Sequence, residues 1–200
     1  MKSEPVEILI GLGANLGDRS DNLRRALSAL ASSKGLTVTA VSSLYETAPL
    51  HLKNQPFYLN AVAALETMLS PSALLSLCRK IELGLHRVRT KRFGPRTIDL
   101  DLLAYDRAVT SESSLTIPHP RLAERRFVLE PLVEIRPDWI HPLLGKSSAR
   151  LLVELIARTG QAQAVLRRPE TGDWGKRWLS GRGSWGENQT LPKGEDDDEE

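Results

Sequence analysis

The stretch RFGPRTIDLDLLAY, residues 92–105, places two carboxylates inside an apolar segment. A β-strand points alternate side chains to opposite faces, so Asp99 and Asp101 would lie side by side on one face. Two adjacent carboxylates repel each other unless a cation or a proton lies between them. Mg²⁺ often binds one or two carboxylates together with substrate phosphates. The pair therefore indicates a magnesium site for a phosphorylated substrate, or else the polar outer face of an antiparallel sheet.

Positive charge is concentrated just before the carboxylate pair. Arginine and lysine occupy several nearby positions with no acid among them, namely Arg87, Arg89, Lys91, Arg92 and Arg96. Such a segment attracts an anion, either a nucleotide phosphate, a nucleic-acid backbone or a lipid headgroup, although it can also be a solvated loop. Phosphoryl transfer requires both a metal on the phosphate oxygens and cationic groups near the developing charge. The two features together predict a phosphoryl-transfer site.

The whole-chain composition narrows the class of protein. Of 200 residues, 40% are hydrophobic and the mean hydropathy is -0.27, which is typical of a globular domain. The net charge is +2, but without the acidic end GEDDDEE the chain keeps 27 basic and 19 acidic residues, a charge of +8. Cys78 is the only cysteine, which excludes an intramolecular disulfide and a cysteine zinc cluster. Short apolar runs and the lack of a signal pattern predict a cytoplasmic protein without a membrane partner.

The elements that must position these residues follow from hydrophobic periodicity and capping signals. We expect strands at 6–13, 37–47, 57–67, 97–105 and 115–120, and helices at 19–33, 71–84, 125–135 and 148–158. The order β-α-β-β-α-β predicts an α+β, ferredoxin-like fold: an antiparallel sheet with helices packed on one face. Residues 1–160 would form one domain, and 161–200 a mostly disordered tail with an acidic end. Three tail tryptophans are unusual for such a segment and could dock on the domain or a partner: Trp174, Trp178 and Trp185.

Two apparent phosphate-binding motifs fail on spacing. GLGANLG at 11–17 has Leu16 where a dinucleotide fingerprint requires its third glycine. GKS at 145–147 has Ile140 where a P-loop requires its first glycine. We therefore interpret the first as a strand-to-helix turn and the second as a turn before a helix.

The segment RFGPRTIDLDLL resembles the signature of the 6-hydroxymethyl-7,8-dihydropterin pyrophosphokinases, a family of folate biosynthesis. Other stretches agree in the same order: GANLGD (13–18), YETAPL (45–50), YLNAV (58–62), KIEL (80–83), RVR (87–89) and TIPHPRLAERRFVLEPL (116–132). The resemblance covers residues 6–158. It implies Mg²⁺-dependent transfer of the β,γ-diphosphoryl group of ATP to the pterin hydroxymethyl oxygen, with release of AMP.

The resemblance also implies a role for individual residues. Asp99 and Asp101 would bind two Mg²⁺ ions. The ATP-binding residues would be Arg87, Arg89, Arg92, Arg96, Thr116, His119 and Arg125, of which Arg87 and Arg96 would also be catalytic. The pterin-binding residues would be Thr47, Pro49, Leu50, Tyr58, Asn60, Phe93 and Phe127. By pattern alone, Asn60 is an exposed strand residue, Phe127 a core residue and His119 a loop histidine.

Four positions depart from the family pattern. Phe93 stands where tryptophan is frequent and Ala48 where proline is frequent, while Arg79 and Ser114 replace residues that often contact the nucleotide. The basic loop is also about one residue short. The loops at 47–56 and 84–96 would act as lids that close over the substrates.

Two other functions fit part of the pattern. An RNA-binding module can have the same fold and a basic loop, but the aromatic signature of such modules is missing here. A nucleotidyl transferase would use the same carboxylates and release diphosphate in place of AMP. We favour the pyrophosphokinase hypothesis. It predicts a monomeric chain that binds only ATP and a pterin alcohol, and neither nucleic acid nor membrane.

Overall fold

The computed structural model describes residues 4–50, 54–87, 94–112, 115–168 and 174. Its strands are β1 (Val6–Ala14), β2 (Leu36–Val41), β3 (Tyr45–Thr47), β4 (Tyr58–Thr67), β5 (Asp99–Tyr105), β6 (Thr110–Glu112), β7 (Leu115–Ile117) and β8 (Val165–Arg167). Its helices are α1 (Arg19–Ala31), α2 (Pro71–Gly84), α3 (Arg126–Ile135) and α4 (Ser148–Thr159), with 3₁₀ turns η1 (Leu122–Glu124) and η2 (Gly160–Gln163). The α+β class is as predicted.

Six antiparallel strands form the main sheet in the order β5-β1-β4-β3-β8, and β2 pairs with β4 further along that strand. β1 lies between β4 and β5, and its register decides which residues become neighbours. Gly13 lies opposite Asn60 on β4 and opposite Asp99 on β5. Gly11 in the same way faces Asp101. The sheet therefore brings together residues more than forty positions apart in the sequence.

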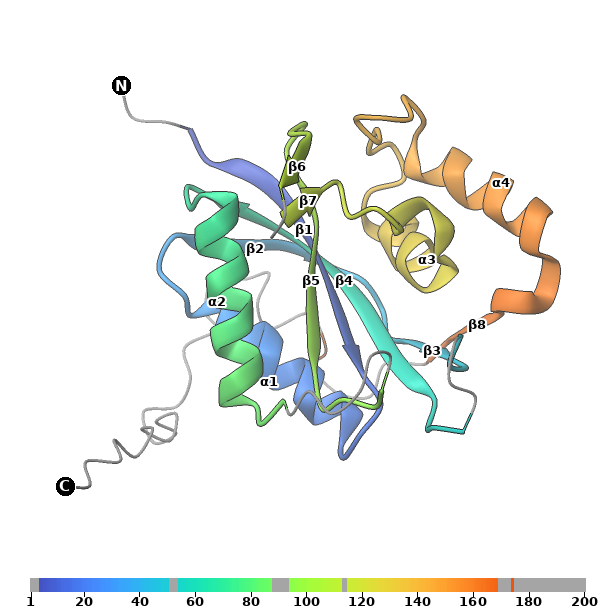
Figure 1. Ribbon diagram of the computed structural model, residues 1–200, viewed down its shortest axis with the longest axis horizontal. Helices are drawn as coiled ribbons and strands as arrows, with labels where there is room; N and C mark the ends of the chain where they lie inside the picture. The colour runs from blue at the N-terminus through green and yellow to red at the C-terminus, as the bar shows by residue number, and fades with distance from the viewer. Residues whose placement is uncertain (1–3, 51–53, 88–93, 113–114, 169–173, 175–200) are drawn as a thin grey trace.

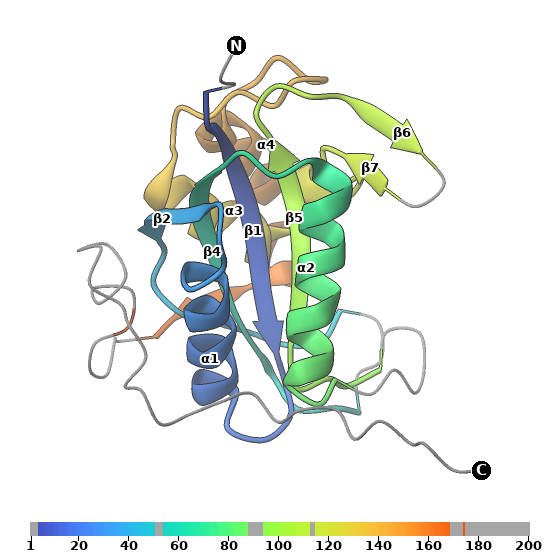
Figure 2. The ribbon, with the colours of Figure 1, turned by 90° about the vertical axis from the view of Figure 1, so that its left-hand side faces the viewer.

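Helices cover both faces of this sheet (Figure 1, Figure 2). α1 and α2 pack on the face formed by Ile8, Ile10 and Leu12 of β1, as predicted for the helices of the ferredoxin-like core. On the other face, α3 packs over Leu9 and Leu103, and α4 packs against α3. The second pair of helices is an addition to the predicted one-face arrangement, and it encloses one end of the face that carries the two aspartates.

The helix starts follow the local signals in the sequence. Asp18 accepts a hydrogen bond from the Asp21 N–H and caps α1, while Ser70 caps α2 just before Pro71. Ser147 caps α4 in the same way. Each cap satisfies backbone donors that have no partner within the helix. The predicted starts of these three helices are therefore confirmed.

The structure divides one expected strand and shows packed residues beyond position 160. The strand expected at 37–47 is two strands, because the buried Ser42 and Ser43 interrupt it. Ser42 Oγ accepts a hydrogen bond from the Val62 N–H at 3.0 Å. Some residues of the tail expected from 161 pack on the domain. β8 pairs with β3, and Trp174 is buried in the main core, because edge pairing and indole burial offset the cost of ordering this segment. Trp178 and Trp185 lie outside the described residues.

Candidate active site

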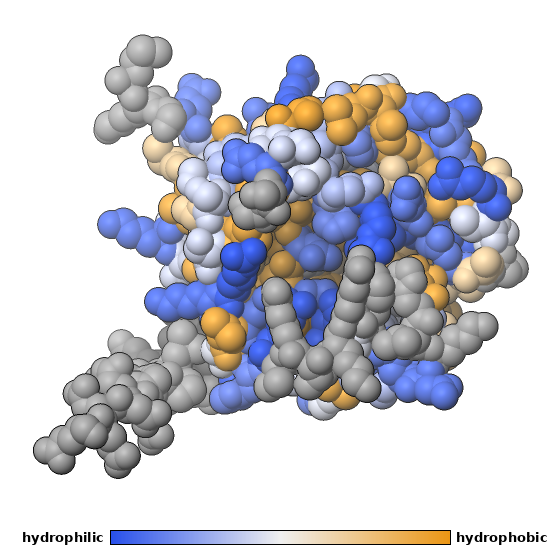
Figure 3. Space-filling model, in the orientation of Figure 1, coloured by the Kyte–Doolittle hydropathy of each residue, from blue (hydrophilic) through white to orange (hydrophobic). Residues whose placement is uncertain are grey.

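A cavity of about 610 Å³ lies on the α3 side of the sheet. Its floor includes Gly11 and Gly13, and its walls come from β4, β5, α2, α3, the end of β3 and the residues on either side of η1. Hydrophilic side chains surround the hollow in the middle of this face (Figure 3). An added Cβ at Gly13 would lie 3.1 Å from Asn60 Oδ1, so glycine keeps this floor low enough for a ligand.

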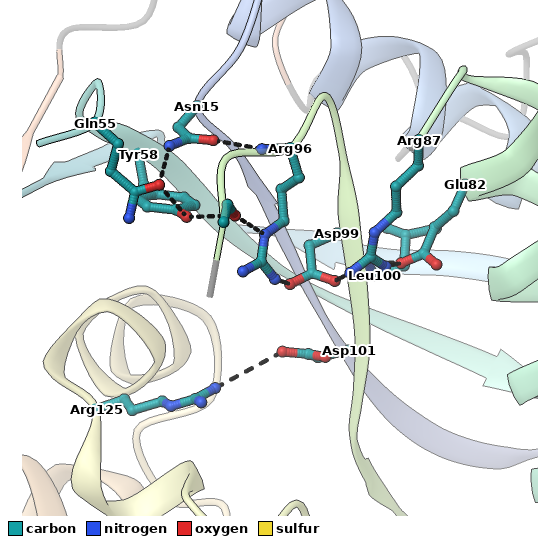
Figure 4. A network of polar contacts seen from close by, with 11 residues as sticks. Asn15, Gln55, Tyr58, Glu82, Arg87, Arg96, Asp99, Leu100, Asp101 and Arg125 are labelled. Atoms are coloured by element: carbon teal, nitrogen blue, oxygen red, sulfur yellow. Dashed lines mark hydrogen bonds and ion pairs between the residues drawn. The ribbon is translucent and has the colours of Figure 1, made fainter. Parts of the chain in front are cut away.

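The acidic pair lies on one wall of the cavity (Figure 4). Asp99 forms ion pairs with Arg87, whose Nη2 is 2.6 Å from Asp99 Oδ1, and with Arg96. Asp101 is much less paired, since the closest Arg125 nitrogen is 3.8 Å away. Its side chain is 39% exposed and lines the cavity. Burial, together with the charge of Asp99, raises the pKa of Asp101 to about 6.

This donor set fits Mg²⁺ bound together with a phosphorylated substrate. Two carboxylates two residues apart on one strand face the same cavity, and the nearby arginines offset the repulsion at Asp101 only in part. Among the residues that the structure describes, no group of three histidine, cysteine or acidic side chains could hold a metal ion alone. A hard cation that keeps water and phosphate oxygens as its other ligands suits such an incomplete set.

A third carboxylate, Glu82 of α2, hydrogen-bonds to β5, the strand that carries the two aspartates. Glu82 is 4% exposed and accepts the Leu100 N–H at 2.7 Å. It also forms an ion pair with Arg87, which in turn contacts Asp99. Burial raises the pKa of Glu82. Because Leu100 lies between the two aspartates, Glu82 is a positioning residue for both of them.

The wall formed by the residues on either side of η1 and by the start of α3 is cationic. Arg125 lies over the Phe127 ring with 5.4 Å between guanidinium carbon and ring centroid, and Arg121 lines the same cavity. Burial, with these two arginines nearby, lowers the pKa of His119 to about 4, so its imidazole is neutral at physiological pH. Its Nδ1 accepts the Arg121 N–H at 3.1 Å. A neutral ring that accepts there can donate from Nε2 to a ligand.

The part of the cavity next to β3 and β4 is lined by polar and aromatic side chains, with Arg96 over the Tyr58 ring at 5.9 Å. Asn60 is buried and donates from Nδ2 to Thr47 Oγ1 at 3.0 Å. Tyr58 and Phe127 contribute aromatic rings to the lining, and Leu50 an aliphatic side chain. A flat heterocycle requires this combination of ring faces with a few fixed donors and acceptors.

Asn15 joins the segments at the two ends of the cavity (Figure 4). Its Nδ2 donates to Gln55 Oε1 at 3.2 Å and to the Pro56 carbonyl at 3.3 Å. Its Oδ1 accepts the Arg96 N–H at 2.7 Å, and its own N–H donates to the Arg96 carbonyl at 3.0 Å. The side chain is fully buried, so these bonds are shielded from water. Asn15 therefore fixes the spacing between the two loops.

Comparisons with known proteins agree with this geometry. A family profile described as 7,8-dihydro-6-hydroxymethylpterin-pyrophosphokinase (HPPK) matches residues 9–137. The chain belongs to the HPPK family. The predicted family resemblance is thereby confirmed, and the RNA-binding alternative is not favoured, since α3 covers part of the sheet face that such a module leaves open.

Relatives of this HPPK chain include single-enzyme and fused proteins. The 2-amino-4-hydroxy-6-hydroxymethyldihydropteridine pyrophosphokinase of Methylorubrum extorquens is 46% identical over 66% of this chain and 83% of its own length. The folic acid synthesis protein fol1 of Schizosaccharomyces pombe is 45% identical, but this chain spans only 18% of it. Plasmodium falciparum HPPK-DHPS has a similar fold, with a TM-score of 0.64, 15% identity and coverage of 80% of this chain and 47% of that one.

Most of the predicted site residues of this HPPK chain lie around the one cavity. They are Thr47, Leu50, Tyr58, Asn60, Arg87, Arg96, Asp99, Asp101, His119, Arg125 and Phe127. Pro49 is not among the lining residues, and neither is Thr116, which is exposed on the β6–β7 hairpin. Arg89, Arg92, Phe93 and Ser114 lie outside the described residues. Ala48 and Arg79, two of the departures from the family pattern, do line the cavity.

Several residues that line or support the cavity were not predicted from the sequence. Gly11 and Gly13 were visible as glycines in a strand, which signals close approach of a ligand or a neighbouring chain, but the segment was interpreted as a turn. Arg121 follows the PHP segment directly and its charge was the available signal. Asn15 and Glu82 lie in the family-like stretches GANLGD and KIEL, but their contacts could not be predicted because their partners are far away in the sequence.

One negative finding concerns membranes. Within the part of the chain that the structure describes, no helix combines the length and apolar character needed to cross a bilayer.

Proposed function

We propose that the chain transfers the β,γ-diphosphoryl group of ATP to the hydroxymethyl oxygen of 6-hydroxymethyl-7,8-dihydropterin and releases AMP. The observation that carries this proposal is the division of one cavity into two unlike ends. Asp99, Asp101 and a group of arginines line the side next to β5, and Asn60 lies across β1 on β4, with the Tyr58 and Phe127 rings beside Arg96 and Arg125. A charged triphosphate and a neutral flat ring system would each find a matching end.

In this proposal the acidic pair binds two Mg²⁺ ions, with Asp99 and Asp101 as protein ligands. Bound there, Mg²⁺ would neutralise the phosphate oxygens and help align the triphosphate. Arg87, Arg96 and Arg125 are within reach of the same carboxylates and would turn toward the phosphates as substrate enters. The proposed additional phosphate contacts of Arg89, Arg92 and Thr116 rest on family resemblance alone.

The pterin would lie between Tyr58 and Phe127, with Asn60 on its polar edge. Thr47 holds the Asn60 amide, so that its Oδ1 remains available as an acceptor for a pterin N–H. Leu50 would contribute to the wall beside the ring, together with Pro49 and Phe93. The hydroxymethyl oxygen would then attack the β-phosphorus in line, and the bond to the α-phosphate oxygen would break.

The closure expected of the loops at 47–56 and 84–96 stays a proposal, since residues 51–53 and 88–93 lie outside the described residues. Asn15 supports this idea, because its side chain bonds to Gln55 and to the backbone of Arg96. Closure would exclude the water that otherwise hydrolyses ATP. The chain would need no second copy, since one protomer provides both ends of the cavity.

Product analysis tests the proposal. The protein is mixed with Mg-ATP and 6-hydroxymethyl-7,8-dihydropterin, and nucleotides and pterins are separated with mass detection. AMP should appear in equal amount with a diphosphorylated pterin. Free diphosphate with a nucleotidylated pterin would support a nucleotidyl transferase instead, and ADP would indicate a simple kinase. Intact ATP in the presence of folded protein would overturn the proposal.

A further inference from the structure

The chain beyond the HPPK match returns to the sheet at the pterin end of the cavity. We propose that residues 165–168 together with Trp174, here called the C-terminal clamp, set the position of Thr47 and thereby the affinity for the pterin. The inference rests on the proposed function, since it assigns the pterin to this end. It adds a positioning role for a segment that lies outside the family match at 9–137.

Backbone pairing is the first contact of the clamp. β8 runs antiparallel to β3, with Val165 opposite Thr47 and Arg167 opposite Tyr45. The Arg168 N–H continues the pairing with a 2.8 Å hydrogen bond to the Leu44 carbonyl. β3 has only three residues, so without β8 it would be a short edge strand held on one side alone.

A polar network makes the second contact. The Arg167 guanidinium donates to Ser43 Oγ at 2.6 Å and to Glu134 Oε1 at 2.9 Å. Glu134, on α3, also accepts the Ser43 N–H and the Tyr45 hydroxyl, each at 2.9 Å. Arg168 pairs with Glu46, which Arg19 of α1 also contacts at 2.9 Å. The segment 43–46 is thus tied by side chains to β8, α3 and α1.

Trp174 makes the third contact. Its side chain is buried among core residues on the α1 side of the sheet, and its Nε1–H donates to the Ser42 carbonyl at 2.8 Å. Ser42 in turn pairs with Val62, which lines the cavity. Burial of a whole indole stabilises far more than a surface contact does, so Trp174 anchors the clamp.

The consequence concerns one end of the cavity. Thr47 is the last residue of β3, and its hydroxyl receives the Asn60 amide. Loosening β3 would let Thr47 shift and leave Asn60 free to rotate away from the pterin edge. Asp99 and Asp101 are on β5, at the far end of the strand order from β8. The clamp should therefore affect pterin affinity and leave nucleotide affinity unchanged.

The test compares substrate affinities in the full chain. Trp174→Ala removes the anchor, Arg167→Gln removes the guanidinium network, and Val153→Ala is the control because that α4 side chain lies outside the clamp and is 60% exposed. Titration calorimetry measures the Kd of 6-hydroxymethyl-7,8-dihydropterin and of a non-hydrolysable ATP analogue with Mg²⁺. We expect about a tenfold rise in pterin Kd for Trp174→Ala, a smaller rise for Arg167→Gln and no change for the control.

Amide hydrogen exchange gives a readout that needs no substrate. The β3 amides should exchange faster in Trp174→Ala and Arg167→Gln than in the wild type, while those of β5 keep their protection. Equal losses of pterin and nucleotide affinity, or unchanged pterin affinity in Arg167→Gln with faster β3 exchange, would overturn the inference. A wild-type protein that binds nucleotide but not this pterin would instead overturn the proposed function. The Arg167 variant decides the matter if Trp174→Ala does not fold.

Discussion

The two ends of the cavity are built on different principles. At the end near β5, like and unlike charges crowd together, and Asp99 alone contacts two arginines. At the end near β3, the chain uses neutral groups whose positions are fixed by hydrogen bonds, such as Asn60 on Thr47. A triphosphate can be bound by charge that rearranges as the substrate enters. A neutral ring gains little from charge and requires groups already in place, so small displacements matter more at the second end.

The largest effect should come from the acidic pair. Asp101→Asn keeps the size of the side chain but removes the charge that faces the cavity. We expect activity to fall by about a thousandfold or more, because metal and phosphate binding both depend on that charge. The melting temperature of the substrate-free protein should rise, since the variant loses the repulsion between Asp99 and Asp101.

Activity assays and thermal scans of the same preparations measure the two effects. Tyr105→Phe, at the other end of β5, is a control that should keep full activity, because Tyr105 does not line the cavity. Loss of activity accompanied by loss of stability in Asp101→Asn would argue for a structural role only.

The second effect concerns the support behind the acidic strand. Glu82→Ala leaves Arg87 without its buried partner and the Leu100 N–H without an acceptor. The free energy of unfolding should decrease by about 3 kcal/mol, as for other broken buried ion pairs. Urea denaturation measures this change.

Glu82→Gln separates charge from shape at the same position. It keeps an acceptor for Leu100 and should restore part of the stability, while kcat stays about tenfold below the wild type because Arg87 and Asp99 are no longer held in place. Full activity in Glu82→Gln would show that Glu82 does not position the pair.

A smaller effect should separate the two ends most clearly. Gly13→Ala adds a methyl group 3.1 Å from Asn60 Oδ1, so the amide must move. Pterin Kd should rise about tenfold, whereas Gly11→Ala, whose methyl group would meet only Leu103 side-chain atoms at 3.4 Å or more, should leave pterin Kd unchanged. Calorimetric titration of both variants is the measurement. Equal weakening in the two would contradict the division of the cavity.

The smallest effect is a pH dependence of stability. The folded pKa of His119 is about 4, below its ordinary value, so the unfolded chain binds more protons between these two values. Stability contributed by neutral His119 is therefore complete above about pH 6.5 and is lost as the pH falls toward 4. We expect His119→Gln to reduce the stability difference between pH 7 and pH 5 by about 1–2 kcal/mol. Denaturation curves at the two pH values test this, and equal differences in variant and wild type would contradict it.

The charged end was easier to predict than the neutral end. Asp99 and Asp101 share a face because strands alternate, and this rule needs no knowledge of the rest of the fold. Asn60 was assigned to the pterin only through family resemblance, since its contact with Thr47 depends on how β3 and β4 pair. Trp174 is the extreme case: the sequence marked it as a candidate to dock on the domain, but its contact with Ser42 joins residues 132 positions apart. Local periodicity and capping therefore predicted the elements, whereas contacts between distant segments required the structure.

The glycine floor of β1 restricts how this enzyme can diverge. At Gly11 and Gly13 every possible substitution adds atoms above the strand. Genetic drift at these two positions can therefore only make the cavity shallower. A descendant that accepts a bulkier substrate would have to change larger side chains at the rim, of which Leu50 and Phe127 are the obvious candidates. New substrates can therefore be accommodated by smaller side chains at the cavity walls, but not by changes at its floor.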